Sequence, residues 1–299
     1  MSRSPNPRTV ALALLAVYVV WGSTYLAMRV AVEGLPPFMM ASARFLVCGA
    51  LLLAFLRWRG AAWPTSREWL SALPVGALMF VTGNGTVAVA EQHLSSGVAA
   101  VVCGTMPLWL AALGHFFGQR ASAREWLALV LGFAGVVVLS SGGELRGEPT
   151  SALLLFCAPV SWAAGSLLSK KLPLAKGLMS AATQMLMGGA VMVGVSVLAG
   201  ERVPTSVPRA SLLAWAYLAT FGSLVAYSAY TYLLANTRPA IATSYAYVNP
   251  IVAVIIGVAL GGEHVGPEVV TAVLLIVAAT VLVMLKARPV PALVSPTES

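Results

Sequence analysis

Apolar residues run through the chain in ten blocks, separated by short connections that hold most of the charged residues. Each block is about 18 to 24 residues long, and a helix needs about 20 apolar residues to cross the hydrocarbon core of a bilayer. The pattern therefore predicts an all-α integral membrane protein with ten transmembrane helices. We place these helices near residues 9–31, 37–56, 69–91, 95–117, 124–142, 151–170, 178–199, 210–234, 240–260 and 268–286.

The second half of the chain repeats the first at an offset of 143 positions. The matched pairs are Pro107 with Pro250, Gly114 with Gly257, and Gly118 with Gly261. The glycines in each copy are four residues apart, so they share a helix face on which another backbone can approach closely in lipid. We therefore predict two five-helix repeats, residues 1–147 and 148–288, followed by a disordered tail at 289–299.

Composition agrees with a membrane protein. Of the 299 residues, 59% are hydrophobic and 9% are charged, and the mean hydropathy is +0.87. Soluble domains carry about a quarter charged residues. The net charge of +8 does not indicate nucleic-acid binding, because the bases lie in short loops without a basic, aromatic-lined face. The cysteines, Cys48, Cys103 and Cys157, lie in apolar blocks without metal-ligand spacing, and we expect no metal site and no cofactor.

The basic residues predict the orientation. If the N-terminus is cytoplasmic, the opposite side carries only Arg29, Arg146, Arg202 and Arg209, and Arg44 lies within a segment. Cytoplasmic loops are enriched in Lys and Arg, so both termini are predicted to be cytoplasmic. Because five crossings are an odd number, the second repeat must be inverted relative to the first. Inverted repeats are typical of secondary transporters, whose substrate site lies between the halves.

Several stretches resemble the EamA branch of the drug/metabolite transporter superfamily. They are the run from Trp21 to Leu56, the passage from Glu91 to Ala100, Pro107, and the run from Ser244 to Glu263. This resemblance implies ten-helix carriers in the bacterial inner membrane, many of which export amino acids, metabolites or drugs. It also implies a central cavity between the first, third, fourth, sixth, eighth and ninth helices, and it places the family's second-helix arginine at Arg44.

Polar and aromatic residues inside the segments are the candidate substrate-binding residues. They are Trp21, Ser23, Thr24 and Tyr25 in the first helix, Asn84 in the third, Trp162 and Ser166 in the sixth, Tyr227 in the eighth, and Tyr245 and Asn249 in the ninth. Each also has a structural interpretation: tryptophan prefers membrane interfaces, hydroxyls bond their own helix, and tyrosine stripes often serve packing. Asn84 either bonds a neighbouring helix or faces substrate.

Prolines and ionisable residues complete the candidate set. Pro107 and Pro250 free carbonyls one turn back and, with Gly114, Gly118, Gly257 and Gly261, are predicted hinges beside the central space. Arg44 is expected to form a structural pair with Glu33 or Glu91, with substrate-carboxylate binding as the alternative. Glu91 and His93 are a candidate exit gate or proton site, or else solvated helix-end residues.

Absent features narrow the function. No carboxylate lies halfway along the first helix, and the lysines lie at helix ends, so the cavity is predicted to be neutral, aromatic and weakly polar. That composition favours export of small amphipathic metabolites, such as hydrophobic or aromatic amino acids or drug-like compounds, by alternating access. The alternatives are a lipid flippase or a non-transporting scaffold. A membrane enzyme is disfavoured because histidines are scattered and Asp is absent. The expected partners are a small-molecule substrate and the lipid bilayer, and the chain is expected to be a monomer or weak homodimer.

Overall fold

The computed structural model describes residues 6–116, 123–237, 241 and 244–284. In these ranges every regular element is helical, which confirms the all-α prediction. Of the sequence predictions, Gly118 and the tail at 289–299 lie outside the described residues. The elements are α1 (Pro7–Ala16), η1 (Val17–Trp21), α2 (Gly22–Val32), α3 (Pro37–Trp58), α4 (Ser66–Gly76), η2 (Ala77–Gly85), α5 (Thr86–Ala90), α6 (Ser96–Cys103), α7 (Met106–Phe116), α8 (Ala123–Ser141), α9 (Gly143–Gly147), α10 (Pro149–Ser169), α11 (Leu178–Leu198), α12 (Arg209–Tyr217), η3 (Leu218–Val225), α13 (Ala226–Asn236), α15 (Tyr245–Gly261) and α16 (Pro267–Met284).

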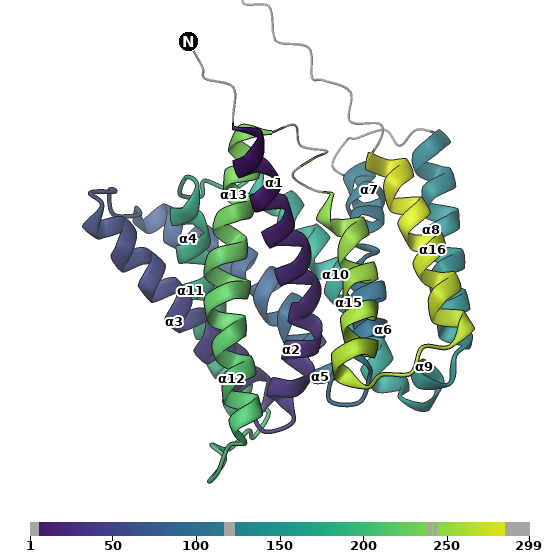
Figure 1. Ribbon diagram of the computed structural model, residues 1–299. Helices are drawn as coiled ribbons and strands as arrows, with labels where there is room; N and C mark the ends of the chain where they lie inside the picture. The colour runs from purple at the N-terminus through teal and green to yellow at the C-terminus, as the bar shows by residue number, and fades with distance from the viewer. Residues whose placement is uncertain (1–5, 117–122, 238–240, 242–243, 285–299) are drawn as a thin grey trace, which may run out of the picture.

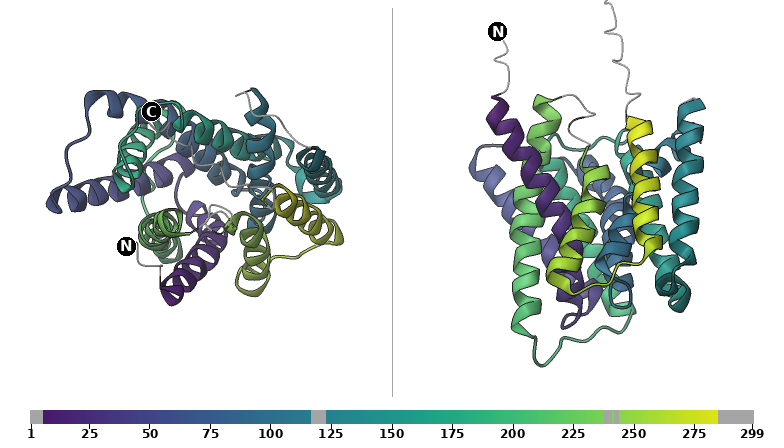
Figure 2. Two further views of the ribbon diagram at one scale, coloured as in Figure 1. Left: turned by 90° about the horizontal axis from the view of Figure 1, so that it is seen from above. Right: turned by 45° about the vertical axis from the view of Figure 1, so that its right-hand side comes forward.

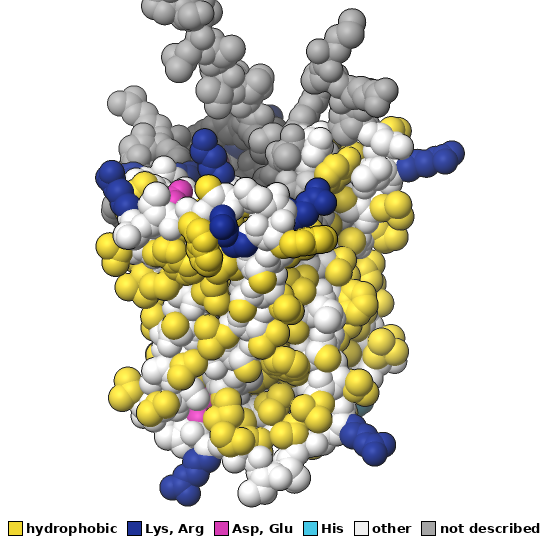
Figure 3. All heavy atoms as spheres, turned by 90° about the vertical axis from the view of Figure 1, so that its left-hand side faces the viewer, with side chains coloured by type: hydrophobic (Ala, Val, Ile, Leu, Met, Phe, Trp, Pro, Cys, Tyr) yellow, Lys and Arg dark blue, Asp and Glu magenta, His cyan; other side chains and the backbone are white. Residues whose placement is uncertain are grey.

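Eight helical spans in the described residues are long and apolar enough to cross a membrane. Four of them combine several elements: Pro7–Val32, Ser66–Ala90, Ser96–Gly114 and Arg209–Leu233. The apolar helices α15 and α16 are shorter. Figure 3 shows an apolar surface over most of one side of the bundle, with basic side chains at both ends and more of them where α1 begins.

Local sequence signals determine where the helices begin and end. Pro37 occupies the first turn of α3, where a missing amide N–H costs nothing. The Thr65 hydroxyl accepts from the Glu68 amide while the Glu68 carboxylate accepts from the Thr65 amide, which makes a capping box for α4. Helix α15 ends at Gly261 and is capped by Gly262, whose φ of 62° is a left-handed conformation that glycine adopts without strain.

The helices pack as a bundle in which distant segments lie side by side. Helix α8 packs along α16 at one edge, and α3 packs along α11 at the other (Figures 1 and 2). Helices α2, α6 and α15 pack together between these pairs. Glycines permit the closest crossings: a Cβ on Gly76 would lie 2.5 Å from the Gln184 carbonyl oxygen, and one on Gly188 would lie 2.7 Å from the Gly76 carbonyl oxygen.

The described ends of the chain lie at the same end of the bundle. Figure 1 shows the start of α1 and the end of α16 at its top, whereas α9, the connection between the two halves, lies at its bottom. We call the end that holds α9 the α9 end. The turns at Glu33–Pro36 and Glu91–Ser95 and the connection from Ala199 to Pro208 also lie there.

Pro107 and Pro250, which match across the repeat, have different effects on their helices. Helix α6 ends at Cys103 and α7 begins at Met106, so the helix is interrupted just before Pro107. Pro250 lies inside α15, which continues through it. A Cβ on Gly104 would lie 2.7 Å from Pro250 Cγ, so the broken helix and the proline-containing helix touch at this point.

Candidate substrate-binding cavity

A cavity of about 180 Å³ lies within the bundle, enclosed by helices from both halves of the chain. Nine of the ten residues predicted to bind substrate line it: Trp21, Thr24, Tyr25, Asn84, Trp162, Ser166, Tyr227, Tyr245 and Asn249. Ser23 does not. Its hydroxyl bonds the Val20 carbonyl oxygen at 2.8 Å and the Tyr217 hydroxyl at 2.6 Å, so it holds α2 to α12.

Widened helical turns carry part of the cavity wall. The π-helical segments η1, η2 and η3 contribute Trp21, Asn84 and Ser223 respectively. A π-turn places one more residue in the turn than an α-turn does, and such turns are frequent at functional sites. Asn84 Nδ2 donates to the Met79 carbonyl oxygen in the same segment at 3.3 Å. Asn84 therefore bonds its own helix and not a neighbouring one, and it borders the cavity, which leaves the substrate-facing alternative open.

Four aromatic rings form one wall, which we call the aromatic wall. The Trp21 ring centroid lies 4.8 Å from that of Tyr245, 5.2 Å from Tyr230 and 6.4 Å from Tyr227. The Trp21 indole Nε1 donates to the Gly222 carbonyl oxygen at 3.0 Å. This bond fixes the indole, and the edge-on contacts place tyrosine rings around it. Tyr230 is not among the predicted binding residues, and it also lines the cavity.

Arg44 lines the cavity too, which corrects two sequence predictions. The residue is 6% exposed, and its Nε donates to Ser223 Oγ at 2.8 Å. It does not pair with Glu33, which is exposed at the end of α2, or with Glu91. Arg29, not Arg44, forms an ion pair with a glutamate, Glu263. The cavity is therefore cationic on one side, whereas the sequence predicted a neutral one.

Two buried polar atoms among the lining residues lack hydrogen-bond partners. They are the donor Trp162 Nε1 and the acceptor Asn249 Oδ1. Buried polar groups are nearly always paired, so each unpaired atom needs an explanation. Both residues border the cavity, but the two atoms themselves are covered, so a bound solute would reach them only after neighbouring atoms shift.

Sequence reasoning missed the flexible part of the lining. Met28, Met79, Met106 and Met185 border the cavity together with Phe45 and Phe80. Methionine is unbranched and adapts to irregular shapes, and it is common at surfaces that accept several ligands. In an apolar membrane segment a methionine gives no signal that distinguishes a cavity wall from a lipid face, so the sequence could not have identified these residues.

The predicted hinge glycines serve close packing. A Cβ on Gly261 would lie 2.7 Å from Leu26 Cδ1, and one on Gly257 would lie 3.1 Å from Ser96 Oγ. These contacts bring α15 against α2 and α6 and agree with the predicted small-residue face. Gly114 is buried in α7.

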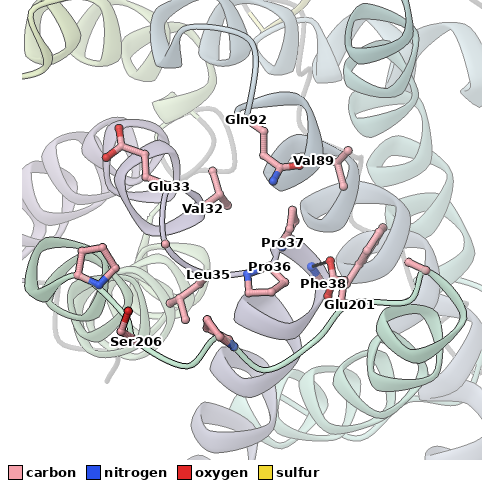
Figure 4. A pocket seen from close by; sticks show the side chains of 14 residues that line it. Val32, Glu33, Leu35, Pro36, Pro37, Phe38, Val89, Gln92, Glu201 and Ser206 are labelled. Atoms are coloured by element: carbon pink, nitrogen blue, oxygen red, sulfur yellow. Dashed lines mark hydrogen bonds between the residues drawn. The ribbon is translucent and has the colours of Figure 1, made fainter.

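A wider hollow of about 770 Å³ opens at the α9 end. Figure 4 shows residues around it from the α2–α3 turn, the α5–α6 turn and the connection before α12, including Glu33, Gln92 and Glu201. The Glu201 carboxylate accepts from the amides of Phe38 at 3.0 Å and Met39 at 2.7 Å, at the start of α3. His93 is exposed in the α5–α6 turn.

A second carboxylate holds helix ends together at this end of the bundle. Glu263 Oε1 accepts from Arg29 Nη1 at 2.5 Å and from the Ser96 amide at 2.8 Å, and Oε2 accepts from the Gly97 amide at 3.1 Å. Burial raises the pKa of Glu263, but the hydrogen bonds from Ser96, Arg29 and Gly97 outweigh burial and hold the pKa below its ordinary value. We call Arg29, Glu263 and the amides of Ser96 and Gly97 the Glu263 latch.

Comparison with known proteins decides the family. The model of the EamA-like transporter family matches the chain twice, over residues 8–141 and 149–285. The chain belongs to the EamA-like transporter family. It is thus a multi-pass membrane transporter, as the resemblance implied.

Named relatives agree with this assignment. The chain is 46% identical over 274 residues to "Uncharacterized inner membrane transporter YedA" of Escherichia coli (strain K12), covering 91% of this chain and 90% of the relative. It is 28% identical over 242 residues to "Protein PecM" of Dickeya dadantii (strain 3937), covering 80% of each. One solved crystal structure superposes with a TM-score of 0.63 at 19% identity, covering 95% of this chain and 100% of the other, and it shows the fold alone.

Proposed function

We propose that this EamA-family transporter exports small amphipathic metabolites, with hydrophobic and aromatic amino acids as its preferred class, by alternating access. The central observation is that Arg44, Trp162 and Asn249 border the same cavity as the aromatic wall, and that Trp162 Nε1 and Asn249 Oδ1 have no hydrogen-bond partner. This cavity combines apolar surface with groups that suit both charges of a zwitterion.

Each part of such a solute has a matching group. The Arg44 guanidinium offers N–H donors in the planar arrangement that suits a carboxylate, and the Trp162 indole offers one more. The free oxygen of Asn249 can accept from an ammonium group. An apolar or aromatic side chain would contact Trp21 and its tyrosines, which also favour a nearby cation. The methionines can adjust to different side chains.

We propose that the carrier consists of two inverted five-helix repeats, residues 1–147 and 148–288, which together cross the membrane ten times. The double match to the family model supports a duplication. Eight spans and two shorter apolar helices are available for the crossings. The position of α9 opposite the start of α1 and the end of α16 supports the inversion. Small rotations about the break before Pro107 and about Pro250 would then expose the cavity to each side in turn.

We place the transporter in the bacterial inner membrane with both termini in the cytoplasm. The printed name of the YedA relative supports this membrane. The concentration of basic residues in the connections on the N-terminal side supports this orientation.

Transport assays in proteoliposomes test the proposal. Purified protein is reconstituted with a labelled amino-acid panel inside the vesicles, and efflux is measured with and without a proton gradient. We expect phenylalanine, tryptophan and leucine to leave faster than they leave protein-free liposomes loaded with the same panel. Glutamate and lysine should leave both kinds of vesicle at the same rate. Movement of a fluorescent lipid reporter without any amino-acid flux would reject the assignment in favour of a lipid flippase.

A further inference from the structure

Glu91 is a buried carboxyl group without a hydrogen-bond partner. The residue is 2% exposed, and neither of its side-chain oxygens is bonded. It directly follows α5 and lies beside the buried apolar residues Ala90 and Leu94. An ionised carboxylate in such surroundings is strongly unfavourable, because it loses its hydration and gains no hydrogen bonds in return. In this conformation Glu91 therefore holds a proton.

The charged groups that act on Glu91 belong to the Glu263 latch. Glu263 and Arg29 exert the electrostatic effects of fixed charges on it, and Tyr25 and Cys103 are titratable neighbours toward the cavity. Helices α3 and α10 also pack near α5, and neither adds a charged group to this set within the described residues. The negative charge of Glu263 opposes ionisation of Glu91, while the positive charge of Arg29 is engaged by Glu263.

The latch joins segments of both halves at the α9 end. Arg29 comes from α2, Ser96 and Gly97 begin α6, and Glu263 follows α15. Any opening of the cavity toward the α9 end that separates α15 from α2 and α6 must break these bonds. A group that competes for Arg29 would weaken the latch.

We propose that Glu91 is the proton-binding group of this gate. With its proton bound, Glu91 is neutral and leaves Arg29 on Glu263, so the gate stays closed. When Glu91 releases its proton to water entering at the α9 end, its carboxylate draws Arg29 away from Glu263 and the amides of Ser96 and Gly97 lose their acceptor. Closing the gate therefore takes up one proton. Glu91 would then couple proton binding to the alternating access of the proposed function, on which this inference rests.

A similar contact nearby provides an internal control. Glu201 also accepts from two amides at a helix start, those of Phe38 and Met39, and Ser196 Oγ donates to it at 2.7 Å. Within the described residues no ion pair involves Glu201, so its contact has no arginine that Glu91 could capture.

Hydrogen–deuterium exchange of the full-length protein in lipid nanodiscs tests the gate without any substrate. Protection factors, corrected for intrinsic exchange at each pH, are measured between pH 5.5 and 8.5 for peptides covering Ser96 and Gly97 and for those covering Phe38 and Met39. Once Glu91 ionises, we expect the protection factors at Ser96 and Gly97 to fall by about tenfold per pH unit. This is the pH dependence expected when opening releases one proton. Protection at Phe38 and Met39 should stay constant.

Two variants complete the test. Glu91→Gln cannot ionise, so protection at Ser96 and Gly97 should stay high and independent of pH. Glu263→Gln should lower that protection even at pH 5.5, while Phe38 and Met39 remain protected and report an intact fold. Equal pH responses at the two helix starts in the wild type, or an unchanged pH response in Glu91→Gln, would overturn the proposal. Because no solute is added, failure of amino-acid transport would leave this result unaffected and would reject only the proposed substrate.

Discussion

Arg44 Nε donates to Ser223 Oγ at 2.8 Å, joining α3 to η3 across 179 positions of sequence. The bond uses one of the five guanidinium N–H groups and sets the plane of the others beside the cavity. Ser223 thus orients the charge that we propose for substrate carboxylates.

Removing this hydroxyl should weaken substrate binding. Hydrogen bonds to charged groups contribute about 1.5–3 kcal/mol, so Ser223→Ala should raise the KM for transported amino acids by about tenfold or more. Ser161→Ala is the matched control, because Ser161 is also buried and bonds the Leu78 carbonyl oxygen but does not line the cavity. Equal KM values for the two variants in proteoliposome transport would show that Ser223 does not orient a binding group.

The two cavity tryptophans should be essential for transport. Trp21→Ala removes the centre of the aromatic wall and its bond to Gly222, and Trp162→Ala removes an unpaired indole donor. We expect both variants to express normally and to lose measurable flux. Trp58→Ala, at a position 80% exposed on the outer surface, should transport like the wild type. Wild-type flux in either cavity variant would refute a solute path along this wall.

The crossing of α4 and α11 predicts opposite effects of one substitution at two glycines. Gly188→Ala places a Cβ 2.7 Å from the Gly76 carbonyl oxygen, and backbone cannot move aside as a side-chain tip can, so the cost should be about 1–3 kcal/mol. Gly194→Ala on the same helix meets nothing within 4 Å and should be neutral or stabilising. Both stability changes are measured as the Tm of each variant in detergent, followed by tryptophan fluorescence. A Tm for Gly188→Ala at or above the wild-type value would contradict the close approach.

The sequence predicted the all-α class and many of the residues that line the cavity, because both depend on residue type and helical spacing; of the ten predicted crossings, the described residues show eight spans and two shorter apolar helices. The predicted segment 69–91 corresponds to Ser66–Ala90, and the aromatic residues inside apolar segments reach the cavity as expected. Residue spacing cannot reveal which side chain faces a buried charge from another helix. The sequence predicts a glutamate partner for Arg44, whereas its hydrogen-bond partner, Ser223, comes from the other half of the chain.

Ser23 shows the same limit from the opposite direction. Its position in a polar stretch of the first helix predicts a cavity contact, but its hydroxyl is hydrogen-bonded to the hydroxyl of Tyr217 on α12. The widened turns η1, η2 and η3 also carry no signal in residue spacing, although they place several of the lining residues.

The Glu263 latch should lose strength in acid. The pKa of Glu263 is lowered in the folded state, so its ionised form stabilises the fold above the ordinary carboxyl pKa, and this contribution is lost as pH falls through the folded-state pKa. The thermal stability of the wild type should therefore fall more between pH 5 and pH 3 than that of Glu263→Gln, which lacks the titrating group. Parallel stability curves for the two proteins would show that the latch carboxylate contributes nothing to this pH dependence.

The most direct measurement compares three ligands that share a phenyl ring: phenylalanine, phenylacetate and phenethylamine. Their affinities for the purified transporter are measured by isothermal titration calorimetry, for the wild type, for Arg44→Lys and for Arg44→Gln. We expect the wild type to bind phenylalanine most tightly, phenylacetate next and phenethylamine most weakly. In Arg44→Gln, binding of the two carboxylates should weaken by about tenfold or more, which corresponds to at least about 1.4 kcal/mol, while phenethylamine should not weaken. Arg44→Lys, which keeps the charge but not the planar donor set, should fall between these values. Equal affinities for the three ligands in the wild type, or carboxylate binding that survives unchanged in Arg44→Gln, would contradict a cationic amino-acid-binding cavity.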